Sequence, residues 1–170
     1  EPDKTSFETS KKNNPGIVFW NKPFPDKNSL KYKYELICMG DFLEHVANTD
    51  QVLEEVYKRL SDNGIVLITV PAYQWMMSNL DVLRLHNKRY SKKLLLKELE
   101  NSGFKKIFIS YFMMALFPLA VVSRKIIEPL RKYTKKSKDI EFSNIGFFNP
   151  VFEFIFSLEN IFLKKNIPLP

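Results

Sequence analysis

Cysteine is nearly absent from this chain, because Cys38 is the only one among 170 residues. A disulfide bond within the chain is therefore excluded, and a reducing compartment such as the cytoplasm is the natural setting. Cys38 lies inside an apolar run, so we expect it to be a buried strand residue and not a nucleophile.

Long hydrophobic runs are also missing. A membrane-spanning helix needs roughly 18 or more apolar residues, whereas the longest run, 111–122, is shorter and contains Pro118. The first residues, Glu1-Pro2-Asp3, are acidic and polar and do not have the pattern of a signal peptide. With 45% hydrophobic residues, the chain can still build the core of one domain.

Histidine is scarce as well. The two histidines, His45 and His86, lie far apart in the sequence and are not part of any metal-ligand spacing. We therefore expect no metal site.

The net charge of +7 is unevenly distributed. Between Arg124 and Glu141 there are seven basic and three acidic residues, so +4 of the +7 lies in this short segment. The rest of the chain is nearly balanced, and no single element combines basic residues with an aromatic stripe. We therefore expect no nucleic-acid partner.

The centre of the chain has the pattern of a parallel β-α-β unit. Two short apolar runs, 34–39 and 65–70, lie on either side of a helical period over 49–61. Asn63-Gly64 is expected to end the helix in the left-handed conformation, and Pro71 to end the second strand. The pattern predicts an α/β fold.

The flanking segments supply further elements. Ser91 is expected to cap a helix with Leu94, Leu95 and Leu99 facing inward, and Ser102-Gly103 to end it. The other expected elements are a helix over 3–13 with Phe7 inward, strands over 17–20 and 104–110, a helical stretch over 113–130 broken by Pro118, a polar segment over 131–144, and a helix over 147–163.

The connection 72–90 is unusually long for a compact domain, and connections of that size are often functional. It contains Trp75, His86, Arg89 and Tyr90, which are our candidates for substrate binding. For His86, anchoring of the loop is an equally good interpretation.

These motifs resemble the second half of a class I S-adenosylmethionine-dependent methyltransferase of the type 11/12-like group. The resemblance rests on the order and spacing of several segments. These are Gly40-Asp-Phe-Leu-Glu-His45, the expected helix that follows it, the turn and strand over 60–71, His86 to Ser91, Gly103-Phe104 and Ser110 to Phe112. It implies a Rossmann-like fold with a mostly parallel, partial sheet over 1–125. Residues 126–170 are then a C-terminal helical addition that packs on or caps the same domain.

The resemblance also implies where the cofactor S-adenosylmethionine binds. Glu1, next to Pro2, matches the acidic residue that holds the ribose hydroxyls, and a carboxylate can accept from both. Asn21 stands where the family often has an Asp that contacts adenine, and it could replace that contact.

The turn Met39-Gly40-Asp41 matches the segment that lies along the methionine part of the cofactor and the substrate. Asp41, His45 and His86 are the candidate catalytic residues. A stabilising acidic helix entrance is the alternative for Asp41, and a structural hydrogen bond is the alternative for His45. Methyl transfer needs a base only if the acceptor must lose a proton.

Two expected parts of the family pattern are missing. The Gly-rich loop after the first strand has no counterpart, and neither does the last strand, which the family inserts after a Leu-Pro like Leu169-Pro170. We therefore expect the sequence to be a segment of a longer protein. A sheet without these strands would expose unpaired edges.

The two C-terminal apolar helices allow three interpretations. They could be buried in the core or in a subunit interface of a homo-oligomer, or they could form a lid over a lipid-like acceptor. The third is peripheral contact with a membrane, helped by the basic residues of 131–138.

We expect a cytoplasmic enzyme, a transferase that methylates a small-molecule or lipid- or glycan-linked acceptor. Two alternatives stay open. One is a methyltransferase-like binding module without activity, and the other is a nicotinamide-dependent Rossmann oxidoreductase.

Overall fold

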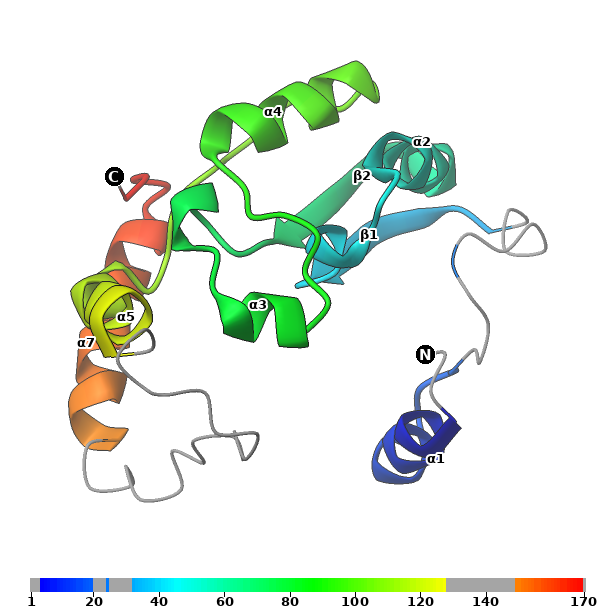
Figure 1. The fold of residues 1–170 in the computed structure, drawn as a ribbon. Coiled ribbons are helices and arrows are strands. Elements are labelled where there is room, and N and C mark those ends of the chain that lie inside the picture. The colour runs from blue at the N-terminus through cyan, green and yellow to red at the C-terminus, as the bar shows by residue number, and fades with distance from the viewer. Residues whose placement is uncertain (1–3, 20–23, 25–31, 128–148, 170) are drawn as a thin grey trace.

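The structure is a computed structural model that describes residues 4–19, 24, 32–127 and 149–169 (Figure 1). A small parallel sheet, β1 and β2, stands at its centre. The helices and strands are, in chain order, α1 (Lys4–Asn13), β1 (Tyr34–Gly40), η2 (Leu43–His45), α2 (Thr49–Arg59), β2 (Leu60–Thr69), η3 (Gln74–Met76), α3 (Asn79–Leu83), α4 (Lys92–Asn101), η4 (Met114–Leu116), α5 (Phe117–Val122), η5 (Ser123–Ile127) and α7 (Asn149–Lys164).

The predicted β-α-β unit is confirmed. β1 and β2 pair in parallel, with Ile37 opposite Val66 and Gly40 opposite Thr69. Parallel strands need a crossover connection, and α2 provides it. Both strands therefore end at the same edge of the sheet, which is where α/β proteins bind their ligands.

α2 ends two residues earlier than predicted, at Arg59. Asn63-Gly64 does not stop the helix but belongs to β2, which begins at Leu60. The pairing shifts register between Tyr34 and Leu36, so the strand bulges here. A Cβ on Gly64 would lie 2.8 Å from the backbone oxygen of Tyr34. Glycine is thus needed for close backbone approach and not for a left-handed turn.

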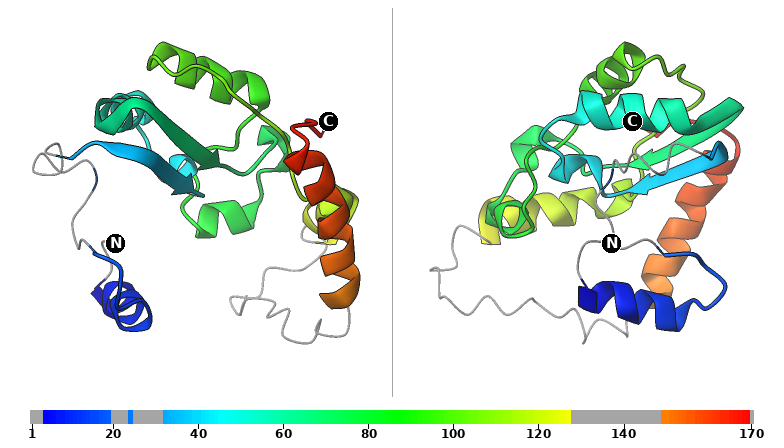
Figure 2. Two further views of the ribbon diagram at one scale, coloured as in Figure 1. Left: turned by 180° about the vertical axis from the view of Figure 1, so that it is seen from behind. Right: turned by 90° about the vertical axis from the view of Figure 1, so that its right-hand side faces the viewer.

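The core lies on one face of the sheet only. α2 and α4 cover this face (Figure 2), and the core residues are Met39, Leu43, Val52, Leu53, Val56, Tyr90 and Leu95. On the opposite face, Leu36 and Leu67 are each 57% exposed. Cys38 also lies on this face and is exposed, so the prediction of a buried cysteine is wrong. Alternate strand residues point to opposite faces, and no described helix covers the second one.

α4 confirms the predicted capping. The Ser91 hydroxyl accepts a hydrogen bond from the backbone N–H of Leu94 at 3.2 Å. Leu95 is buried as predicted, but the side chain of Leu94 is exposed because it lies at the edge of the apolar stripe. Gly103 follows the helix with φ +89°, a conformation that favours glycine.

Two predicted strands do not form. Ile17 and Val18 are exposed and without strand pairing, and Trp20 lies outside the described residues. Residues 104–110 pair with no strand of the described residues, because an open groove of about 1200 Å³ separates them from β2. A strand needs a neighbouring backbone, and apolar sequence alone does not supply one.

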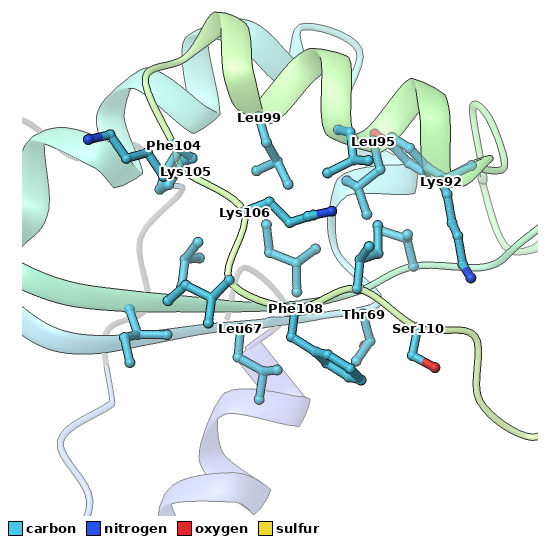
Figure 3. A pocket seen from close by; sticks show the side chains of 18 of the residues that line it. Leu67, Thr69, Lys92, Leu95, Leu99, Phe104, Lys105, Lys106, Phe108 and Ser110 are labelled. Atoms are coloured by element: carbon cyan, nitrogen blue, oxygen red, sulfur yellow. The ribbon is translucent and has the colours of Figure 1, made fainter. Parts of the chain in front are cut away.

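Figure 3 shows this groove, with Leu67 and Thr69 of β2, Leu95 and Leu99 of α4, and Phe108 among its labelled residues. The resemblance to methyltransferases places a further strand between β2 and residues 104–110. The groove lies at that position.

The C-terminal elements contact the domain at one end of the sheet. Pro118 does not break a helix but occupies the first turn of α5, where proline is tolerated. The backbone N–H of Ala115 donates to Glu159 of α7 at 2.7 Å. After α7, the backbone N–H of Leu169 donates to the Ser110 hydroxyl at 2.8 Å. The apolar helix is confirmed over 149–163, whereas the polar segment 131–144 lies outside the described residues.

None of the described helices combines the length and the apolar character that crossing a membrane requires.

Candidate functional site

The carboxyl edge of the sheet is formed by the ends of β1 and β2. Asp41 follows β1 with φ +46°, a left-handed conformation that aspartate adopts more readily than most residues. Its backbone N–H donates to the backbone oxygen of Thr69 at 3.0 Å, which ties the two strand ends together. The Asp41 side chain stays exposed at this edge, beside Gly40.

The acidic motif folds into the short helix η2, directly after Asp41. Leu43 is fully buried in the core, and Glu44 next to it is only 1% exposed. Neither carboxylate oxygen of Glu44 has a hydrogen-bond partner in any other described residue. Burial raises the pKa of Glu44, and its own backbone N–H and the two histidines offset this only in part. A buried carboxylate without a partner is unusual in proteins.

The end of the long connection is fastened to η2 by its backbone. The N–H of Asn87 donates to the backbone oxygen of Glu44 at 2.7 Å. The Asn87 side chain donates to the backbone oxygen of His45 at 2.8 Å. His45 Nδ1 lies 3.2 Å from the backbone oxygen of Leu85. As a result, the rings of His45 and His86 lie edge to face, with their centroids 4.8 Å apart.

Asp81 anchors the same connection through its side chain. Its carboxylate is 1% exposed and lies 2.8 Å from Arg89 Nη2, 2.7 Å from Arg124 Nη1 and 2.9 Å from His86 Nδ1. Burial by itself would raise the pKa of Asp81, but the hydrogen bonds and charges of Arg89 and Arg124 outweigh it and hold the pKa well below its usual range. Asp81 is therefore ionised at neutral pH.

Aromatic side chains surround the start of the connection. Tyr73 stacks on Tyr111, with ring centroids 4.9 Å apart, and also contacts Phe117 at 5.0 Å. Trp75 meets Phe117 edge to face at 6.0 Å, yet 52% of Trp75 stays exposed. Tyr73 itself has φ +63°, a strained conformation for a bulky residue. Strain of this kind is often found at functional sites.

The structure brings some of the predicted site residues together. Gly40, Asp41, His45 and His86 lie on adjoining segments that follow β1 and end the long connection. Met39 is buried in the core, so its side chain packs inward and only its backbone lies along the edge.

The remaining predicted site residues are separate from this group. Trp75 is exposed and stays a candidate for substrate contact. Glu1, Pro2 and Asn21 lie outside the described residues, so their cofactor contacts stay predictions.

Arg89 and Tyr90 are both engaged with the protein itself. The guanidinium of Arg89 is buried and bonded to Asp81 and to the backbone oxygen of Ala72. Tyr90 is 2% exposed, and burial raises the pKa of its hydroxyl well above the usual value. Their contact with a substrate stays a prediction.

The sequence interpretation also missed one residue of this region. Asp81 holds His86 in place, but it is the one acidic residue in the connection 72–90, and only the fold shows its partners. The treatment of His45 and His86 as isolated residues is likewise wrong, because tertiary packing and not sequence spacing brings them together.

The comparison with protein families agrees with this architecture. A family model described as a methyltransferase domain matches residues 2–108, well over half of the chain. The parallel unit, with its polar carboxyl edge, and this match define a class I methyltransferase-like domain. The chain belongs to the methyltransferase domain family. No curated protein and no solved structure gives a significant match.

Proposed function

We propose that this chain is an S-adenosylmethionine-dependent methyltransferase and that its acceptor is a small or lipid- or glycan-linked molecule. The observation that carries the proposal is the match of residues 2–108 to the methyltransferase family, together with the carboxyl edge at Gly40 and Asp41. The same match favours a methyltransferase over the nicotinamide-dependent alternative.

The residues at the carboxyl edge suit the methionine part of the cofactor. Gly40 is exposed, and a Cβ on it would meet only the Thr69 hydroxyl, at 3.7 Å. The backbone is thus open to close approach by a ligand. Beside it, the exposed Asp41 carboxylate can pair with an ammonium group. When bound, S-adenosylmethionine supplies an electrophilic methyl group on a sulfonium.

The work of the protein in such a reaction is mainly alignment of acceptor and donor. If the acceptor must lose a proton, the groups near this edge that can accept it are Asp41, His45 and His86. Glu1, by resemblance, would accept hydrogen bonds from the ribose hydroxyls.

Exposed apolar side chains next to the histidines favour an apolar acceptor. Val82, Leu83 and Leu85 are 64%, 59% and 77% exposed, and they directly precede His86 in the sequence. Exposed apolar side chains that gather in one short segment often mark a ligand or interaction surface. This is the reason to propose a lipid-like acceptor, and peripheral membrane contact is the related alternative.

Calorimetric titration of S-adenosylhomocysteine into the full chain tests the proposal. We expect micromolar binding that Asp41→Ala weakens at least tenfold, because this change removes the carboxylate from the edge. Asp62→Ala is the matched control, since Asp62 is also an exposed aspartate but lies in the bulge of β2. Binding should be unchanged there.

Absence of binding by a folded chain would contradict the enzyme and support the binding module. Binding that responds equally to Asp41→Ala and Asp62→Ala would contradict the assigned site. A binding-competent chain can then be screened with apolar and polar acceptors, using radiolabelled methyl donor. Preference for polar acceptors would refute the lipid-like class.

A further inference from the structure

We propose that Glu44, His45 and His86 form a binding site for one divalent transition-metal cation, of which Zn²⁺ is the type. The proposal does not depend on methyl transfer, and it reverses the expectation from the sequence that no metal site exists. It rests on the geometry of three ligand atoms, on the hydrogen bonds that fix both imidazoles, and on the unpartnered carboxylate.

The three side chains converge. One ligand atom from each residue can be chosen so that all three lie within 4.8 Å of one another. Zinc bonds of about 2 Å place two ligand atoms roughly 3 to 3.5 Å apart. Small side-chain rotations therefore close the site, and His45, which is exposed, has the freedom to make them. The exposed side of His45 also provides access for a hydrated ion.

Both imidazoles have the tautomer that a metal ligand needs. The backbone oxygen of Leu85 can only accept, so His45 Nδ1 carries the proton and donates across 3.2 Å. The Asp81 carboxylate already accepts hydrogen bonds from Arg89 and Arg124, so His86 Nδ1 also donates to it, across 2.9 Å. With Nδ1 donating in both rings, Nε2 is the atom of each ring that is available to a metal ion.

These two hydrogen bonds match the usual surroundings of a metal-bound histidine. Such a histidine nearly always donates its other N–H to a carboxylate or to a backbone carbonyl. Here His86 donates to a carboxylate and His45 to a carbonyl. The two hydrogen bonds thus hold both rings close to the orientation that an ion would need.

Glu44 is the independent observation that points to a ligand. Its side chain is 1% exposed, and both carboxylate oxygens lack a partner among the other described residues. Burying a polar group without a partner destabilises a fold, and a bound cation would remove that cost. No hydrogen bond from another described residue explains why the carboxylate is buried there.

The donor set indicates the class of cation. Two imidazoles and one carboxylate suit zinc and its neighbours in the first transition row, whereas Ca²⁺ and Mg²⁺ prefer all-oxygen sites. Three protein ligands also leave at least one coordination position for water or for a ligand oxygen. Open sites of this kind are typical of catalytic and not of structural zinc.

The test is direct binding of Zn²⁺ to the full chain, produced without a histidine tag and treated with a chelator. We expect one Zn²⁺ per chain in calorimetry, and a rise in melting temperature that grows with the Zn²⁺ concentration. Co²⁺ should give the visible absorption of a low-symmetry site with nitrogen and oxygen ligands. No cofactor is added, so failure of this experiment is distinct from failure of the proposed function.

Variants decide whether the bound ion uses these ligands. His45→Ala removes an exposed ligand with little risk to the fold and should weaken Zn²⁺ binding at least tenfold. Glu44→Gln keeps the shape of the buried side chain and should also weaken it. Cys38→Ser is the control, because the exposed thiol is another zinc ligand, and its Zn²⁺ affinity should equal that of the unaltered chain.

Three results would overturn the proposal. The first is no Zn²⁺ binding by a chain whose circular dichroism shows it to be folded. The second is an affinity unchanged by His45→Ala or lost in Cys38→Ser. The third is a Glu44→Gln chain that is more stable and binds Zn²⁺ as before, which would identify Glu44 as a neutral buried acid.

Discussion

Substitution of Asp81 by asparagine should destabilise the fold strongly, because it removes the acidic partner that Arg89 and Arg124 share among the described residues. Oδ1 of Asp81 accepts from Arg89 Nε at 3.0 Å and from Arg89 Nη2 at 2.8 Å. Oδ2 accepts from Arg124 Nη1 at 2.7 Å and from the Ser78 hydroxyl at 3.1 Å. Asparagine keeps one acceptor oxygen but turns an amide N–H₂ towards a guanidinium.

The magnitude follows from how deeply the pair is buried. The side chains of Asp81 and Arg89 are 1% and 7% exposed, so solvent cannot replace the lost partner. Breaking a buried ion pair on one side costs about 3 to 5 kcal/mol. The total stability of a domain is about 5 to 15 kcal/mol, so a large fraction of it is at stake.

Urea denaturation followed by circular dichroism measures the free energy of unfolding. Asp62→Asn is the matched control, because it removes the same charge at an exposed position and should change stability by no more than about 0.5 kcal/mol. A loss below about 1 kcal/mol for Asp81→Asn would refute the reasoning, because it would show that the two arginines find solvent or other partners.

The dependence on pH gives an independent check. The folded-state pKa of Asp81 lies below its unfolded value of about 4, so its stabilisation is complete above that value. It is lost as the pH falls through the folded-state pKa. The difference in stability between the unaltered chain and Asp81→Asn should therefore shrink as the pH falls below about 4. A difference in stability that stays constant down to about pH 2 would contradict the low pKa of Asp81.

Three further substitutions test the fold by the same urea denaturation. Gly64→Ala should cost about 1 to 3 kcal/mol because the added Cβ would lie 2.8 Å from the Tyr34 backbone oxygen. Gly16→Ala is its control, because a Cβ there meets no described atom within 4 Å. Equal losses of stability in the two variants would count against the close contact at Gly64. Leu53→Ala should cost about 2 to 5 kcal/mol because Leu53 is fully buried. A loss under about 1 kcal/mol would mean that α2 packs loosely on the sheet. Ser91→Ala should cost about 0.5 to 2 kcal/mol by removing the cap of α4, whereas Ser91→Thr should restore most of it; no loss would show that the cap is dispensable.

The sequence predicted the elements whose signals are local. The apolar runs, the helical period over 49–61 and the serine cap of α4 depend on residues a few positions apart, and the two strands, the helix up to Arg59 and the cap are confirmed. The segment 104–110 has apolar residues such as Phe104, Ile107 and Ile109 but no paired strand among the described residues. Its failure shows that strand formation depends on a partner that local sequence does not reveal.

The exposure of Cys38 has the same origin. A continuous apolar run predicts burial on both faces of a strand, but burial requires a covering layer on each face. The described helices cover the face of Ile37 and Met39 only. Residue type indicated a strand correctly, and only the tertiary arrangement determined which side is buried.

For the site, the sequence located the edge but not the partners. Gly40 and Asp41 follow directly from the position after a strand, because the chain direction fixes which end is the carboxyl end. The burial of Arg89 and Tyr90 was not foreseen, because polar and aromatic residues in a long connection look alike whether they face solvent or the core.

Stability and site geometry are coupled through a single connection. Leu85 has φ +60°, a conformation that costs a non-glycine residue about 1 to 3 kcal/mol and persists only when its surroundings enforce it. Asn87 fixes the connection to η2 on one side, and Asp81 fixes it to Arg89 and Arg124 on the other. The strained turn between these anchors is the one that presents a carbonyl to His45 and sets His86 beside it. The Asp81 network therefore does more than stabilise the fold, because it keeps the strained backbone at Leu85 in the conformation that places the two imidazoles side by side. A variant that loses the network should lose the arrangement of the histidines before the β-α-β core unfolds.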